Sequence, residues 1–190
     1  MNLTKLTQEI FDHLYQDITE FRTTFDLPVN APSSLDDAAD MLHSSLAIEE
    51  MTELAEADSK IEQADAIIDS VYVLMGRLVH LGNDKVEANV AISYLIELLL
   101  HVAANRNIDF IKCWDEIHSS NMSKVCRSEA EYAETEAHYA KQGITLMSVQ
   151  KGAYVIAKCA EDFISEAKTI RKGKVLKSVY YRPADLAPIV

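Results

Sequence analysis

Residues 64–75 read ADAIIDSVYVLM and are apolar nearly all the way around a helix, yet they include Asp65 and Asp69. A helix that is apolar on every side is expected to be buried. Burying a carboxylate costs free energy unless a positive partner compensates its charge. Together with Glu62, the two aspartates occupy a stripe about 60° wide, because their spacings are three and four residues. This segment therefore predicts a buried helix over about residues 59–80 with a cation beside its acidic stripe.

A second acidic group lies on the preceding helical segment, in EEMTE at residues 49–53. Lys60 and Arg77 are the only bases between residues 23 and 84, so a bound metal ion is the favoured partner. A short connection favours antiparallel packing of the two helices, which would bring the two acidic groups together. Oxygen ligands without His or Cys suit Mg²⁺, or Mn²⁺, better than zinc. The expected metal-site acids are Glu49, Glu50, Glu53, Glu62, Asp65 and Asp69.

Helical spacing of apolar residues continues along most of the chain. Five glycines and four prolines leave little material for turns, which favours long helices over many short strands. We expect an all-α helical bundle forming one domain over residues 1–190. Residues 145–190 are predicted to form a C-terminal helix, over SVQKGAYVIAKCAEDFISEAKTIRKG, followed by a basic tail.

Charge and cysteine content restrict the partners and the compartment. The net charge is −12, with 26 acids against 9 bases in residues 1–140 and 4 acids against 9 bases in residues 141–190. An acidic body argues against nucleic acid as the main partner. The longest apolar run, AISYLIELLL, is too short for a membrane span, and the N-terminal segment lacks a signal-peptide core. Three widely spaced cysteines predict free thiols and a cytoplasmic protein.

Four blocks carry a resemblance to a known superfamily. EEMTE, EQADAIIDSVYVLMG, IHSSNMSKV and GKVLKSVYYRPADL follow one another in this order. The set resembles the all-α NTP pyrophosphohydrolases, which include MazG, phosphoribosyl-ATP pyrophosphohydrolase and the dimeric dUTPases, and it is similar to a MazG-like branch of phages and bacteria. The resemblance implies a helical bundle assembled as a homodimer or a higher homo-oligomer. It also implies a magnesium-dependent enzyme that cuts a nucleoside triphosphate between its α and β phosphates.

Site residues follow from the resemblance position by position. The ExxE and ExxD ligands match Glu50, Glu53, Glu62 and Asp65, and Asp69 is the extra aspartate of this branch. Only eight residues separate Glu53 from Glu62, and aligning Asp69 as the terminal aspartate would place Ala66 where a glutamate belongs. Asp65 and Asp69 therefore both stay candidates for the last ligand. Glu49 or Glu50 is expected to orient or deprotonate the attacking water.

Phosphate oxygens beyond the metal need other donors. The expected substrate-binding residues are Asn121, Lys124, Lys174, Lys177 and Tyr180. A (deoxy)nucleotide, dUTP or a non-canonical triphosphate, is the expected substrate on the branch resembled. The alternative from another class is a non-enzymatic acidic helical adaptor that binds a basic partner, which predicts exposed aspartates.

Overall fold

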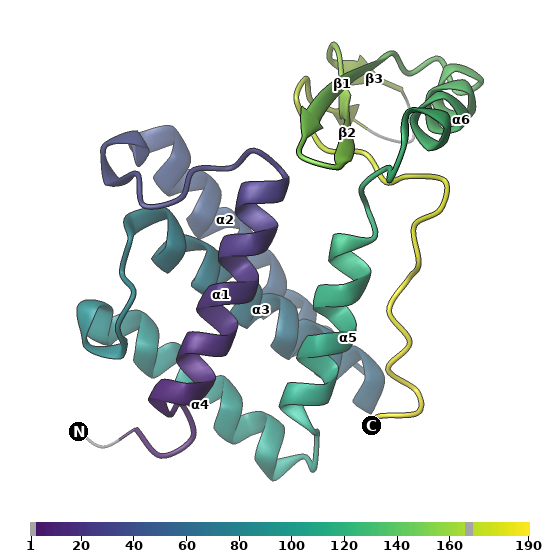
Figure 1. Cartoon of the computed structure of the whole chain (residues 1–190). Coiled ribbons are helices and arrows are strands. Elements are labelled where there is room, and N and C mark those ends of the chain that lie inside the picture. The colour runs from purple at the N-terminus through teal and green to yellow at the C-terminus, as the bar shows by residue number, and fades with distance from the viewer. Residues whose placement is uncertain (1–2, 166–168) are drawn as a thin grey trace. The chain divides into compact units, whose positions relative to one another are not determined.

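The computed structural model describes residues 3–165 and 169–190. The described residues contain six α-helices and only two small strand pairs, so the all-α prediction is confirmed (Figure 1). The helices are α1 (Gln8–Thr24), α2 (Asp37–Glu56), α3 (Lys60–Leu81), α4 (Val90–Asn105), α5 (Phe110–Met122) and α6 (Glu129–Ala140). Short 3₁₀ turns at Pro32–Ser34 and Val86–Asn89 precede α2 and α4.

Two compact units divide the chain. Unit 1 holds residues 1–23, 27–118 and 185–190, and unit 2 holds residues 24–26 and 119–184. Unit 1 carries 22 acids against 7 bases, whereas unit 2 carries 8 acids against 11 bases. The single-domain organisation over residues 1–190 stays a prediction, and each unit is described by itself below.

In unit 1, α2 and α3 form an antiparallel pair joined by residues 57–59. Their contacts run in opposite directions along the chain: His43 meets His80, and Met51 accepts a hydrogen bond from Ser70. Asp36 caps α2 by accepting from the amide of Ala39. Apolar side chains of α1, α3, α4 and α5 fill the core, among them Phe11, Leu14, Ile18, Ile67, Ile68, Val71, Met75, Ile96 and Trp114.

Gly82 ends α3 with a φ of +73°, a left-handed conformation that favours glycine. The helix α4 with its preceding turn, Val86–Asn105, is long and apolar enough to cross a membrane by length and composition. Core helices of soluble proteins meet the same criterion, and Ile92, Ile96 and Ala103 of this helix are buried within the unit.

The predicted C-terminal helix within residues 145–190 is wrong. Strands β1 (Leu146–Lys151) and β2 (Tyr154–Cys159) form an antiparallel hairpin instead, and β3 (Phe163–Ile164) pairs with β4 (Thr169–Ile170). Gly152 opens the two-residue hairpin loop with a φ of +56°, a conformation that glycine adopts without strain. The predicted helix also crossed residues 166–168, which lie outside the described residues.

Unit 2 has its own small core, in which side chains of α6, the hairpin and the C-terminal segment meet, namely Cys126, Tyr132, Ile144, Leu146, Val155, Ala157, Cys159, Ile170 and Leu176. After β4 the chain runs without a helix or an extended strand ladder to residue 190, as predicted for the basic tail. Cys113, Cys126 and Cys159 are buried free thiols, which confirms that prediction.

Candidate active site

The acidic residues of α2 meet those of α3 at Glu50. The pKa of Glu50 is raised to about 7. Burial is the main cause, and the nearby carboxylates of Glu53, Glu49 and Asp65 add to it. Asp65 acts on Glu50 from the neighbouring helix, so the antiparallel register brings EEMTE and the acidic stripe of α3 together. Glu50 therefore titrates near neutral pH.

Asp65 departs from the prediction that it is buried. Its side chain is exposed, although Ala64, Ala66 and Ile67 beside it are buried. The stripe of Glu62, Asp65 and Asp69 lies at an edge of α3 that the rest of unit 1 leaves partly uncovered, and Asp69 is half-buried. Neighbouring protein atoms nevertheless displace enough water to raise the pKa of Asp65.

Glu62 caps the start of α3 in this structure. Its Oε2 accepts hydrogen bonds from the amides of Asp58 and Ser59, both at 2.9 Å, while the Ser59 hydroxyl accepts from the amide of Glu62 at 3.1 Å. This reciprocal arrangement is a capping box at the start of α3. The backbone amides of Ser59 and Asp58 hold the pKa of Glu62 below its ordinary value. Glu62 is thus turned toward the helix cap.

The donor set on α2 and α3 fits a hard divalent cation. Glu49 and Glu53 are exposed, Glu50 is half-buried, and every candidate ligand atom is a carboxylate oxygen. Within the described residues, the side chains that already converge to metal-binding distances lie on α1 and α5. The α2–α3 acids would therefore have to rotate inward to hold an ion. Burial is the main cause of the raised pKa of Glu50, and the repulsion from Glu53, Glu49 and Asp65 adds to it, so a cation beside these carboxylates would be favourable.

The expected phosphate-binding residues all lie in unit 2. Lys124 donates from Nζ to Asn121 Oδ1 at 2.6 Å, Lys177 lies 4.2 Å from the centre of the Tyr181 ring, and Tyr180 donates to Glu134 at 2.6 Å. Lys174 accepts a backbone hydrogen bond from Cys159. The prediction that these five residues bind phosphate stays a prediction.

Sequence reasoning missed two arginines near Tyr180. Arg127 and Arg182 line a cavity of about 450 Å³ in unit 2 together with Tyr180. Arg182 also donates to the Ser119 hydroxyl at 2.9 Å. Its place within the resembling block GKVLKSVYYRPADL was the available signal.

A small apolar cavity beside the acidic helices was also missed. It measures about 140 Å³ and is lined by residues that include Leu46 of α2, one turn from Glu50, and Val73 of α3, one turn from Asp69. Its lining also includes the polar side chains of Arg22 and His43. Burial lowers the pKa of Arg22 to about 10, so it stays protonated at neutral pH, and burial and Arg22 lower the pKa of His43 to about 4, so it stays neutral.

Glu97, His101 and Trp114 have structural roles in unit 1. Glu97 and His101 form an internal pair at 3.0 Å, and Glu97 is held by backbone amides of residues 4–6. Trp114 is fully buried in the core of unit 1.

The comparison with protein families decides the class. Residues 18–93, which contain α2, α3 and all six acids, match the phosphoribosyl-ATP pyrophosphohydrolase family. This segment belongs to the all-α NTP pyrophosphohydrolase superfamily. The family consists of hydrolases that act on a nucleotide pyrophosphate bond, which assigns residues 18–93 to this class of enzyme domain. No curated protein and no solved structure matches the chain.

Proposed function

We propose that the chain is a Mg²⁺-dependent pyrophosphohydrolase that cleaves the α–β bond of a (deoxy)nucleoside triphosphate, releasing the monophosphate and pyrophosphate. The observation that carries this proposal is Glu50 of the matched segment, whose pKa is raised to about 7 by burial and by the charges of Glu53, Glu49 and Asp65. A site that concentrates uncompensated carboxylates in this way favours a divalent cation and a substrate that arrives with it. Mn²⁺ is the alternative ion.

Glu50, Glu53 and Asp65 are the proposed ligands, with Glu62 and Asp69 as further ones. Asp65 is favoured over Asp69 because its charge acts directly on Glu50. When bound, the ion would neutralise the charge of the phosphates that it contacts. Glu49, exposed beside Glu50, is proposed to orient the attacking water and accept its proton.

The small cavity of α1, α2 and α3 is the proposed place of the base. Apolar walls suit the faces of a base, and Arg22 and His43 offer polar groups at its border. Its volume of about 140 Å³ suits a small base. The proposed substrate is dUTP or a non-canonical deoxynucleotide. Asn121, Lys124, Lys174, Lys177 and Tyr180 are proposed to bind phosphate oxygens, and the protein is proposed to work in the cytoplasm.

A panel of canonical and modified nucleoside triphosphates with Mg²⁺ tests the reaction. We expect pyrophosphate and the nucleoside monophosphate in equal amounts, with the highest kcat/KM for a deoxynucleotide. Chelation of the metal should abolish turnover, because the carboxylates would then repel the triphosphate. Orthophosphate as the sole product would contradict α–β cleavage.

Asp65→Asn and Asp69→Asn are the matched pair of variants for this assay. Each removes one charge from the same stripe of α3 while keeping the side-chain volume. If Asp65 is the ligand, its variant should lose activity and magnesium-dependent thermal stabilisation together, while the Asp69 variant keeps both.

A non-enzymatic acidic adaptor is the second candidate, and the exposure of Glu49, Glu53 and Asp65 favours it. Such an adaptor would bind a basic partner without any requirement for a divalent ion. The absence of turnover across the panel, together with unchanged thermal stability on adding Mg²⁺, would support the adaptor over the enzyme.

We also propose a homodimer, formed through the exposed apolar side chains of α2 and α4. Ile48 of α2 is 67% exposed. Leu98 of α4 is 58% exposed and lines an apolar cavity together with Met51, Leu74 and Leu95. Leu98→Glu should therefore yield a monomer in size-exclusion chromatography with light scattering, because a buried unpaired charge would oppose association. Ile164→Glu, at an even more exposed apolar position in unit 2, is the control and should leave the dimer intact. A dimeric Leu98→Glu variant would contradict this interface.

A further inference from the structure

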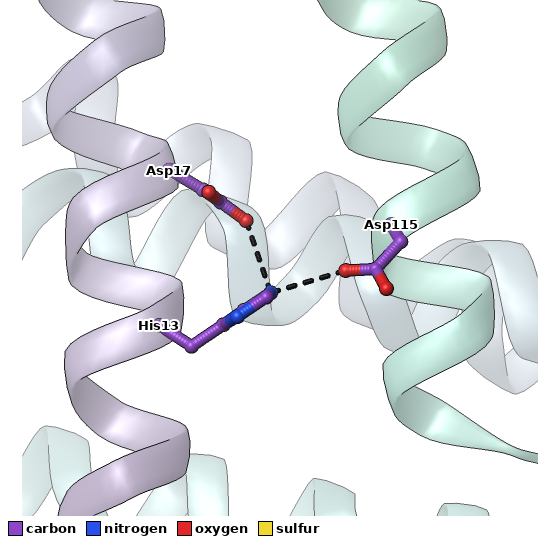
Figure 2. Close-up of side chains that lie close together, drawn as sticks. All are labelled: His13, Asp17 and Asp115. Carbon is purple, nitrogen blue, oxygen red and sulfur yellow. Dashed lines mark hydrogen bonds and ion pairs between the residues drawn. The ribbon is translucent and has the colours of Figure 1, made fainter.

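Helices α1 and α5 bring histidines and carboxylates together in unit 1, on the side of α1 that faces α5. Figure 2 shows His13 pointing between Asp17 of its own helix and Asp115 of α5. His13 Nε2 lies 3.3 Å from Asp17 Oδ2 and 3.0 Å from Asp115 Oδ1. These contacts satisfy His13, so this first group needs no further partner.

A second group, which shares Asp17 with the first, contains a buried nitrogen without a hydrogen-bond partner. It consists of Asp17, Glu20 and His118, whose ligand atoms all lie within 4.8 Å of one another. His118 Nε2 is 3.6 Å from Glu20 Oε2 and 3.9 Å from Asp17 Oδ1, and both separations are too long for hydrogen bonds. The His118 side chain is only 12% exposed. Its Nε2 is the one buried side-chain nitrogen or oxygen among the described residues without a hydrogen-bond partner.

The surroundings fix the orientation of both side chains. His118 Nδ1 lies 3.1 Å from the Tyr72 hydroxyl, so the other ring nitrogen is occupied and Nε2 is the atom that faces the carboxylates. The Trp114 indole donates to Asp17 Oδ2 at 2.8 Å, on the oxygen that His13 also contacts. Asp17 Oδ1 is thereby directed toward His118.

The separations suit ligands of one ion. Two ligands bound at about 2.0–2.2 Å in tetrahedral geometry lie about 3.3–3.6 Å apart. The 3.6 Å between His118 and Glu20 falls in this range, and the 3.9 Å to Asp17 exceeds it by a few tenths of an ångström. A hydrogen bond on the second nitrogen of a ligating histidine, as Tyr72 provides here, is a usual companion of metal binding.

We propose that Asp17, Glu20 and His118 form a binding site for a divalent transition-metal ion of the zinc class, separate from the proposed magnesium site. An imidazole ligand selects such an ion over Mg²⁺, which prefers oxygen ligands alone. The ion links α1 to α5 within unit 1, with water completing its coordination. Asp17 and His118 lie outside residues 18–93, so the family match does not account for the site.

Zinc binding to the intact, metal-stripped protein tests this site. The titration is followed by calorimetry and thermal shift with Mg²⁺ in excess, so that the α2–α3 carboxylates are saturated with their own proposed ion. We expect one equivalent of tightly bound Zn²⁺ and an increase in melting temperature. His118→Gln and Glu20→Gln should each weaken zinc affinity at least tenfold, because each removes one of three protein ligands.

His138→Gln is the matched control, since His138 is an exposed histidine on α6 of unit 2 and should leave zinc affinity unchanged. Co²⁺ absorption gives a second readout, because visible bands from bound Co²⁺ should be present in the wild type and lost in His118→Gln. Glu20 is exposed, so its variant should fold even if the His118 variant does not, which circular dichroism checks. Absence of zinc binding, or equal affinity in the wild type and Glu20→Gln, would overturn the proposal.

Discussion

Glu50→Gln is expected to stabilise the metal-free protein at pH 8 and to lower pyrophosphate release at least a hundredfold. The pKa of Glu50 is about 7 in the folded state, above its ordinary value near 4.5. Ionised Glu50 therefore destabilises the fold, and this penalty grows as the pH rises from about 4.5 to 7 and is full above that. A glutamine carries no charge to desolvate, but it also offers one ligand oxygen fewer to the ion.

The size of the gain is limited by the partial exposure of Glu50. A shift of this direction on a half-buried group is worth about 1–2 kcal/mol after allowance for solvent screening. That corresponds to an increase in melting temperature of several degrees. Thermal unfolding in chelator at pH 5 and pH 8 measures the stability, and a pyrophosphate assay measures the turnover.

Glu56→Gln is the matched control, because Glu56 is an exposed acid at the end of α2. It should change neither the stability at pH 8 nor the turnover. If Glu50→Gln is destabilised at pH 8, Glu50 does not sit in an uncompensated acidic environment. If it retains full turnover, the proposed role of Glu50 as a ligand is wrong.

Glu97→Gln is expected to destabilise unit 1 by about 2–4 kcal/mol at pH 7. Oε2 of Glu97 accepts from the amide of Leu6 and Oε1 from that of Thr4, both at 2.6 Å, and the carboxylate also binds the amide of Lys5. Burial opposes ionisation, but the amides of Leu6 and Thr4 lower the pKa of Glu97 to about 2. A neutral amide would replace the charged acceptor and weaken the attachment of residues 4–6 to α4.

The pH dependence of this effect has a defined direction. A carboxylate whose pKa is lower in the folded state stabilises the fold above its unfolded pKa near 4.5. That contribution declines as the pH falls from about 4.5 through 2. Urea unfolding should therefore show a difference between wild type and Glu97→Gln that is constant above pH 5 and shrinks below pH 4. Glu87→Gln, an exposed acid just before α4, is the control, and a difference that stayed constant down to pH 2 would contradict the assignment.

The helices were predictable because local rules and packing agree in them. Asp36 and Ser59 cap the starts of α2 and α3, and Gly82 ends α3. The hairpin at residues 146–159 was missed because its alternation is weak: β2 is buried at Val155, Ile156 and Ala157 in succession. A continuous apolar run of this length suits a buried strand as well as a helix turn. The β-branched residues around Gly152 were the signal that could have decided it.

The acidic site was predictable in its residues but only partly in their arrangement. Spacing alone places Glu62 in the same stripe as Asp65. The three-residue spacing from Ser59 to Glu62 also matches a capping box, and the structure shows Glu62 in that role. The exposure of Asp65 depends on which neighbours cover the edge of α3, and a helical pattern does not specify them. The group of Asp17, Glu20 and His118 joins positions about a hundred residues apart, so no local spacing could reveal it.

In the capping box, the backbone amides at the start of α3 compete with a cation for the carboxylate of Glu62. If an ion recruits Glu62, the amides of Asp58 and Ser59 lose their acceptor and pass to water. The hydrogen-exchange rate of these two amides should therefore rise if Glu62 becomes a metal ligand. Faster amide exchange in the three-residue connection between α2 and α3 would thus indicate that the bound ion has four carboxylate ligands, and unchanged exchange that it has three.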